Sequence, residues 1–331
     1  MGFLQTVFIG IALVGVANGF ETTEEKVAAI NNLPVIGILS LPIKPYENFN
    51  VSGTSYIASS YVKYLEMSGA RVVPIRIDHS YAELDELFPQ LNGILFTGGT
   101  ADFWVNSSST PVLSPDYGAK GCYLFNKVLK SNDDGNFFPL WGTCMGFELL
   151  HICANNQFAT LGNFHGKPPY TQVSTFLPAA NSSKIFNTLD PNWSKLVMKN
   201  METKNVTLLN HNHGISPDTY TQFPQLSSMF TVLSHMKDKS GSTFVGMIEG
   251  VKYPIFGSQF HPEKNNFEWD SQAFPHFYDA VDTTIFMANF FVSQTRKNLN
   301  TFSQSQLKSQ LIYNWPPVFI NSYFETISSF S

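Results

Sequence analysis

The chain has 331 residues and a formal net charge of -5 at pH 7, and 43% of its residues are hydrophobic. This length and apolar content are enough for a sizeable core, in one large domain or two small ones. The acidic balance argues against a nucleic-acid partner, which would require a basic face. Only 3 cysteines occur, so the chain is not a disulfide-rich scaffold.

Residues 1–19 form an apolar run that closes on Ala17, Asn18 and Gly19. The run is short for a membrane span and ends in small residues, so it predicts a signal peptide cleaved near Gly19. No Lys or Arg precedes the apolar core, and an uncleaved anchor is therefore the alternative. We expect residues 20–331 to be one soluble domain, with no membrane contact after cleavage. Glycosylation sequons agree with secretion and lie at Asn50, Asn106, Asn181, Asn192 and Asn205.

The first half of the chain alternates apolar, β-branched runs with segments of helical period. The apolar runs are 34–41, 71–77, 93–96 and 137–141, and the helical segments are 56–67, 81–91 and 117–130. This alternation predicts an α/β fold with a doubly wound, mostly parallel sheet and helices on both faces, the layering of flavodoxin-like proteins. Chemistry on such a sheet lies at the carboxyl ends of the strands.

From Pro168 onward the expected strands are shorter and several alternate in polarity, which predicts antiparallel pairing. They are 173–177, 196–198, 206–210, 230–235, 243–249 and 254–259. No linker intervenes, so we interpret them as a continuation of the same sheet plus an antiparallel patch. A long helix is expected over 274–296, and its predicted buried stripe is Phe277, Val281, Ile285, Ala288 and Val292. A Ser- and Gln-rich connection then leads into a C-terminal tail, 298–331.

Residues 140–148 read Leu-Trp-Gly-Thr-Cys-Met-Gly-Phe-Glu. An apolar strand that passes through Gly-x-Cys-x-Gly into a helix is the arrangement of a nucleophile elbow, with Cys144 as the nucleophile. At a helix N-terminus the pKa of Cys144 is expected to fall, which favours the thiolate. A tight turn with a buried cysteine is an equal alternative. Cys122 and Cys153 lie in helical patterns and are expected to be buried apolar side chains.

A base for Cys144 is expected at His261, where an apolar strand runs out into His-Pro-Glu. Glu263, two residues further on, can accept a hydrogen bond from Nδ1 and fix the imidazole tautomer, as the third member of a catalytic triad does. A surface histidine in a proline turn is the ordinary alternative. Both Cys144 and His261 follow predicted strands, so a doubly wound sheet would bring them to the same edge.

An oxyanion hole is expected next to Cys144. Gly98 and Gly99 follow the third predicted strand and offer a backbone N–H, and the amide of Met145 is the second donor. An ordinary Gly-Gly turn is the alternative. Neither a Walker Lys-Ser/Thr nor a full Gly-x-Gly-x-x-Gly is present, so a phosphate-binding loop is poorly supported.

Three segments together resemble the class I glutamine amidotransferase fold, and more closely its secreted relatives, the gamma-glutamyl hydrolases (peptidase family C26). They are Thr-Gly-Gly at 97–99, the elbow at 141–148, and Phe-His-Pro-Glu-Lys at 260–264. The likeness covers nearly the whole mature chain. It implies Cys144 as nucleophile and His261 as proton-transfer partner, and the wider superfamily implies Glu263 as the third member.

The resemblance also implies a second histidine and an acidic residue near the substrate. The matching positions are His213 and Glu148, although His211 lies close enough in the sequence to be confused with His213. Thr97 stands where many relatives have proline, which leaves the oxyanion geometry less constrained. The family implies no metal and no cofactor, and it implies a homodimer.

The implied activity is a cysteine hydrolase that cleaves γ-glutamyl amide bonds through a γ-glutamyl thioester. Folylpoly-γ-glutamates and polyglutamyl antifolates are the expected substrates, and the lysosome, the vacuole or the extracellular space is the expected location. The alternatives are an amidotransferase-type glutaminase and a secreted, non-catalytic binding protein. Arginines are scarce, so the substrate carboxylates are expected at Lys167 or Lys264.

Overall fold

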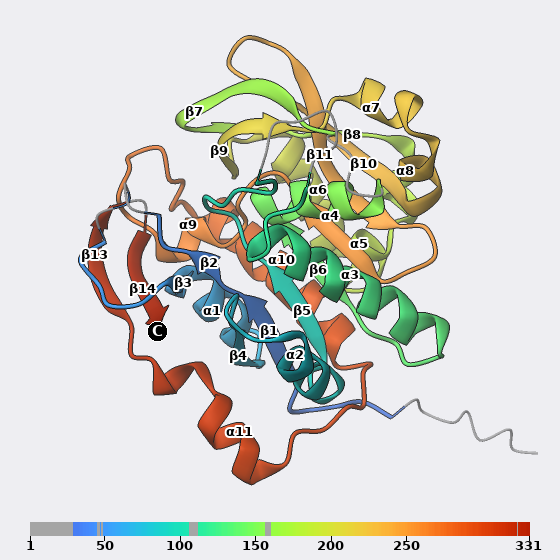
Figure 1. Ribbon diagram of the computed structural model, residues 1–331. Coiled ribbons are helices and arrows are strands. Elements are labelled where there is room, and N and C mark those ends of the chain that lie inside the picture. The colour runs from blue at the N-terminus through green and yellow to red at the C-terminus, as the bar shows by residue number, and fades with distance from the viewer. Residues whose placement is uncertain (1–28, 45–46, 48, 106–111, 156–159, 323) are drawn as a thin grey trace, which may run out of the picture.

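The computed structural model describes residues 29–331, except for 45–46, 48, 106–111, 156–159 and 323 (Figure 1). The predicted signal peptide, 1–19, and the sequon at Asn106 lie outside the described residues. Within the described part, no helix combines the length and the apolar character needed to cross a membrane.

An eight-stranded sheet forms the centre of the molecule, in the order β4-β1-β5-β6-β12-β11-β10-β8. Its parallel part consists of β4 (Arg71–Ile75), β1 (Val35–Leu39), β5 (Gly93–Phe96), β6 (Leu140–Thr143) and β12 (Ile255–Ser258). Its antiparallel part adds β11 (Thr243–Gly250), β10 (Phe230–Lys237) and β8 (Thr175–Phe176). The prediction of a mostly parallel sheet with an antiparallel continuation is confirmed.

Helices cover both faces of this sheet (Figure 1). One layer contains α2 (Tyr81–Leu87), α3 (Tyr117–Asp133) and α4 (Met145–Ala154), and the other contains α1 (Ser59–Glu66), α6 (Pro191–Thr203) and α10 (Tyr278–Thr295). Shorter helices are α5 (Lys184–Asn187), α7 (Pro217–Gln222), α8 (Pro224–Met229), α9 (Lys264–Phe267), α11 (Gln304–Gln310), η1 (Phe88–Gln90), η2 (Pro178–Ser182) and η3 (Ile312–Asn314). The doubly wound α/β prediction is therefore confirmed.

Two predictions for the second half are wrong in detail. Residues 196–198 are not a strand but part of α6, because Asp190 caps the helix and Val197 and Met201 bury one face at helical spacing. In α10, Phe277 precedes the helix and is 45% exposed. Ala288 and Val292 are buried as predicted, and Val281 and Ile285 are partly buried. The buried face also includes Phe286, Met287, Phe290 and Phe291.

Two smaller antiparallel sheets flank the central one. The first has the order β13-β14-β3-β2 and joins β13 (Val318–Ser322), β14 (Phe324–Phe330), β3 (Ser55–Ala58) and β2 (Leu41–Pro42). The second pairs β7 (Gly162–Gln172) with β9 (Thr207–Gly214). The segment expected to be a tail, 298–331, thus returns to the body of the protein through β14, which pairs with β3.

Cys122 of α3 and Cys153 of α4 form a disulfide, with their Cα atoms 5.1 Å apart. The prediction that both are simply buried apolar side chains is wrong. The two helices lie side by side on one face of the sheet, and Gly121 permits their close approach because a Cβ there would collide with Leu149 Cδ2. Nothing in the 31-residue sequence separation indicates this pairing.

Candidate active site

Cys144 lies between the end of β6 and the first residue of α4, with φ 51° and ψ -106°. A positive φ is strained for a residue with a Cβ and is characteristic of functional turns. The backbone holds this conformation from two sides, since Cys144 N donates to Ser258 O at 2.8 Å and Cys144 O accepts from Glu148 N at 3.0 Å. The predicted nucleophile elbow is therefore the observed geometry.

The two glycines of the elbow are required by close backbone contacts. A Cβ at Gly146 would collide with Phe96 O on β5, and a Cβ at Gly142 would lie 2.6 Å from Gly146 O. Strand and helix approach each other closely at this point, so side chains are excluded on both sides of Cys144.

His261 and Glu263 form a buried pair, in which His261 Nδ1 lies 2.8 Å from Glu263 Oε1. A hydrogen bond from Nδ1–H to this carboxylate leaves Nε2 as the nitrogen that exchanges protons. β12 runs parallel to β6 with Ser258 opposite Thr143, so the segments after the two strands emerge together at one sheet edge.

Gly98 marks the point where the imidazole and the nucleophile meet. A Cβ at Gly98 would lie 2.7 Å from His261 Cε1 and 2.9 Å from both Cys144 Cβ and Tyr61 Oη. The structure thus brings together residues from three strand ends, as the doubly wound topology predicts.

Of the predicted oxyanion donors, Gly98 N–H is already engaged, because it donates to Tyr61 Oη at 2.7 Å. Met145 N–H faces the Cys144 sulfur, and Gly99 has φ 150°, a conformation that favours glycine. The role of Gly99 and Met145 as oxyanion donors stays a prediction.

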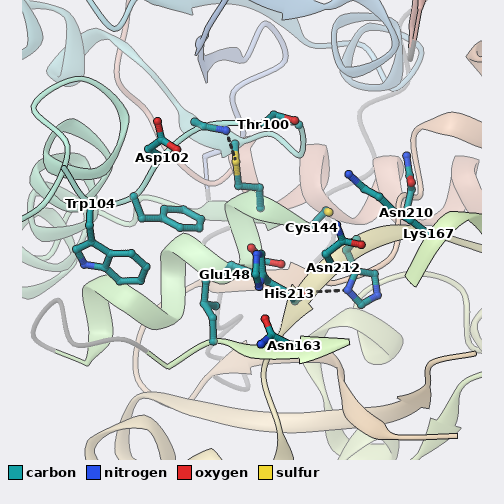
Figure 2. Close-up of a pocket in the computed structure, with 16 residues that line it drawn as sticks. Thr100, Asp102, Trp104, Cys144, Glu148, Asn163, Lys167, Asn210, Asn212 and His213 are labelled. Carbon is teal, nitrogen blue, oxygen red and sulfur yellow. Dashed lines mark hydrogen bonds between the residues drawn. The ribbon is translucent and has the colours of Figure 1, made fainter. Parts of the chain in front are cut away.

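A cavity of about 540 Å³ opens in front of Cys144 (Figure 2). Trp104 and Asp102 lie at one end, and Lys167 and Asn210 lie at the other end close to Cys144. The walls come from the segment after β5, from α4, and from β7 and β9. They include Gly99, Thr100, Phe103, Met145, Glu148, Asn163, His211, Asn212 and His213.

The Peptidase C26 family matches residues 34–263 of the chain. The chain belongs to the peptidase C26 family. It is 37% identical over 292 residues to Gamma-glutamyl hydrolase B of Dictyostelium discoideum, covering 88% of this chain and 80% of that protein. It is 34% identical over 309 residues to Gamma-glutamyl hydrolase 1 of Arabidopsis thaliana, covering 91% and 84%. It is also 34% identical over 302 residues to Gamma-glutamyl hydrolase of Homo sapiens, covering 90% and 87%.

Among solved structures, a glutamine amidotransferase from Thermotoga maritima aligns with 80% of this C26 peptidase and 96% of its own chain. The sequence identity is 11% and the TM-score is 0.39. That likeness is too distant to bear on function.

Burial raises the pKa of the Cys144 thiol well above its usual range, and the negative charges of Glu148 and Glu263 raise it further. Met145 N–H and the charge of Lys264 lower this pKa, but by less. The predicted fall in the Cys144 pKa is therefore wrong, because desolvation exceeds the effect of the helix N-terminus.

Glu148 is a buried carboxyl on the first turn of α4 that faces the cavity. Burial raises its pKa to about 8, while the hydrogen bond from Gln259 Nε2 and the charge of Lys167 act in the opposite direction. The predicted substrate-side acid is therefore in the cavity, and it holds its proton at mildly acid pH.

The two candidate histidines both line the cavity from β9, but they differ in burial. His213, the predicted substrate residue, has an exposed side chain at the rim. His211 is 3% exposed, its Nδ1 donates to His213 O at 2.6 Å, and burial lowers its pKa to about 4. Its Nε2 is buried and has no hydrogen-bond partner in the described part of the chain, so His211 lines the cavity as a neutral imidazole without exposing this nitrogen.

Sequence reasoning missed Tyr61 and Gln259. Tyr61 lies on α1, far in sequence from every motif, and nothing local identifies it. Gln259 lies two positions before His261, so its place next to the predicted His-Pro-Glu motif could have identified it. Among the described residues, no group of three His, Cys, Asp or Glu side chains could hold a metal ion.

Proposed function

We propose that this chain is a cysteine-type gamma-glutamyl hydrolase that cleaves poly-γ-glutamyl small molecules such as folylpolyglutamates. The observation that carries the proposal is the strained Cys144 elbow beside the His261–Glu263 pair, in a C26 family member whose relatives are named gamma-glutamyl hydrolases.

In the acylation step the Cys144 sulfur attacks the γ-carbonyl carbon and His261 Nε2 takes the thiol proton. Glu263 holds the Nδ1–H and stabilises the imidazolium that forms. His261 then gives the proton to the departing amine as the C–N bond breaks. The products are the free amine and a γ-glutamyl thioester on Cys144.

In the deacylation step water attacks the thioester carbon and His261 accepts a proton from it. The C–S bond breaks, the proton returns to Cys144, and the γ-carboxylic acid leaves. Backbone N–H groups of Gly99 and Met145 hold the oxyanion of both tetrahedral intermediates. Such donors are typically worth about 3 to 4 kcal/mol each.

The cavity supports an extended substrate with an aromatic end group. Trp104 and Phe103 stand edge to face at one end, with ring centroids 5.6 Å apart. Cys144 lies toward the opposite end, near Lys167 (Figure 2). A pteridine or aminobenzoyl ring on the aromatic wall would place its polyglutamyl chain along the cavity toward Cys144.

We further propose that the protein passes through the secretory pathway to a lysosome or vacuole, to the extracellular space, or to both. The Cys122–Cys153 disulfide supports an oxidising compartment. The sequon asparagines in the described part are all exposed: Asn50, Asn181, Asn192 and Asn205.

We also propose that the protein is a homodimer, as the family resemblance implies. Sedimentation equilibrium tests this oligomeric state.

The test of the activity is hydrolysis of a short poly-γ-glutamyl folate at mildly acid pH, followed by mass spectrometry. The wild-type protein should release glutamate or short γ-glutamyl peptides, and Cys144→Ala should release none while it keeps the wild-type melting temperature. Hydrolysis that persists in Cys144→Ala would overturn the assignment of Cys144 as the nucleophile. Ammonia release from glutamine without any cleavage of the folate would overturn the proposed folylpolyglutamate substrate and favour a glutaminase activity.

A further inference from the structure

A second cavity of about 200 Å³ lies on the imidazole side of the active site. His261 forms part of its wall, and Gly99, Thr100, Lys167 and Asn210 border it and the larger cavity alike. The two cavities are therefore neighbours that meet beside the catalytic residues. Resting on the proposed function, we propose that the second cavity binds the leaving amino acid and selects an anionic one through Lys264 and Lys167.

The position of His261 decides which cavity takes which part of the substrate. The imidazole must give its proton to the departing amine, so the leaving group lies against His261. His261 borders the smaller cavity, whereas Cys144 and Glu148 border the larger one. The acyl group that becomes the thioester thus belongs in the larger cavity, and the amine belongs in the smaller one.

The charges of the smaller cavity suit a dicarboxylate. Lys264 is buried, and its Nζ lies 4.4 Å from the centroid of the Phe324 ring, which forms another part of the wall. Its positive charge lowers the pKa of both Cys144 and Glu268. Lys167, exposed on β7, adds a second ammonium at the border of the two cavities.

One carboxyl group, Glu47, opposes these lysines in the lining of the smaller cavity. Its oxygens accept hydrogen bonds from Lys44 N at 2.8 Å and from Tyr56 Oη at 3.5 Å. Burial raises the pKa of Glu47, which reduces its negative charge in mildly acid solution. The lining therefore carries two ammonium groups against one carboxyl. Outside the lining, the buried Glu268 carboxyl also interacts with the Lys264 charge, and burial raises its pKa as well. Both carboxyls are thus less charged than free ones in mildly acid solution, which leaves the cavity complementary to the two carboxylates of a leaving glutamate.

The experiment compares γ-glutamyl-glutamate with the same dipeptide in which both carboxyl groups of the leaving residue are amides. The wild-type protein should favour the charged substrate at least about tenfold in kcat/KM, because hydrogen bonds to charged groups are the stronger ones. Lys167→Met should reduce this preference about tenfold by raising KM for the charged substrate alone. Lys195→Met, on the exposed face of α6 and outside both cavities, is the matched control and should behave as wild type.

Lys264→Met should likewise reduce the preference for the charged substrate, and Lys264→Arg should keep part of it. If Lys264→Met does not fold, Lys167→Met alone decides. Equal rates for the two substrates in the wild type, or an equal loss on both in Lys167→Met, would overturn the inference.

If the wild type cleaves neither dipeptide, the poly-γ-glutamyl folate assay decides about the proposed function, and calorimetric titration of free glutamate into Cys144→Ala decides about the cavity. Binding that Lys167→Met weakens about tenfold supports the site, and absence of binding overturns it.

Discussion

A side chain at Gly98 would occupy space that Tyr61, Cys144 and His261 already fill. In Gly98→Ala the new Cβ would lie 2.7 Å from His261 Cε1 and 2.9 Å from Cys144 Cβ. We expect kcat to fall about 100-fold, since small displacements of reacting groups have effects of this order. Gly241→Ala is the control, because its Cβ meets nothing within 4 Å at φ 88°. It should lose some stability and keep kcat, and a Gly98→Ala enzyme with normal kcat would contradict the geometry.

Tyr61 connects the loop after β5, which contains Gly98, to the His261 imidazole. Its hydroxyl accepts from Gly98 N at 2.7 Å and lies 3.4 Å from His261 Nδ1. Tyr61→Phe should lower kcat about tenfold with little change in KM, because the hydrogen bond that positions the loop is lost. Tyr64→Phe is the control on the same helix, since the buried Tyr64 hydroxyl has no hydrogen-bond partner in the described part of the chain. Equal effects of the two substitutions on kcat would refute a specific role for Tyr61.

Glu148 makes stability depend on pH. Its pKa is about 8 in the folded protein and near 4.5 in the unfolded chain, so between these values the folded state holds a proton that the unfolded state has lost. The free energy of unfolding should therefore decrease as pH rises from 5 to 8. Glu148→Gln should remove about 2–4 kcal/mol of that decrease. Urea denaturation of both proteins at pH 5 and pH 8 measures the difference, and identical pH slopes would contradict it.

The disulfide between α3 and α4 restrains α4, the helix that begins directly after Cys144. Removing it with Cys122→Ala and Cys153→Ala should lower the free energy of unfolding by about 3–4 kcal/mol, because a closed loop of this length restricts the unfolded chain. The measurement is urea denaturation of the double variant against the wild type. Dithiothreitol should shift the wild-type midpoint toward that of the variant and leave the variant unchanged; a wild type insensitive to the reductant would count against the prediction.

At the level of elements, the sequence predicted those parts whose signal is local. Strand β5, the elbow and the His-Pro-Glu turn combine apolar runs with glycine or proline at fixed spacing, and all were placed correctly. The disulfide, Tyr61 and the choice between His211 and His213 depend on distances between segments far apart in the chain, and no local pattern contains that information. Residues 196–198 were misread because a short apolar run has no period of its own, and Asp190 upstream was the better signal.

The molecule as a whole assembles its site from segments far apart in the chain, including the C-terminal strand β14. Phe324 of β14 borders the smaller cavity. The next residue also contacts the active-site region, because Glu325 N donates to Glu268 Oε2 at 2.7 Å, close after the His-Pro-Glu turn. Phe324→Ala should lower kcat/KM about tenfold, because it opens this wall and removes the ring under Lys264. Phe319→Ala, a 63% exposed position on the neighbouring β13, is the control and should change neither kcat/KM nor the melting temperature. An unchanged kcat/KM in Phe324→Ala would show that β14 does not contribute to the reaction.

The place of Phe324 in the wall has a consequence for biosynthesis. Translation delivers Cys144, His261 and Glu263 well before it reaches β14, so a nascent chain carries its reactive groups while one side of the leaving-group cavity is still missing. Activity would then be acquired late, after the ribosome has passed residue 324. A transcript with a premature stop codon between the codons for Glu263 and Phe324 would encode Cys144, His261 and Glu263 but leave one wall of the smaller cavity incomplete.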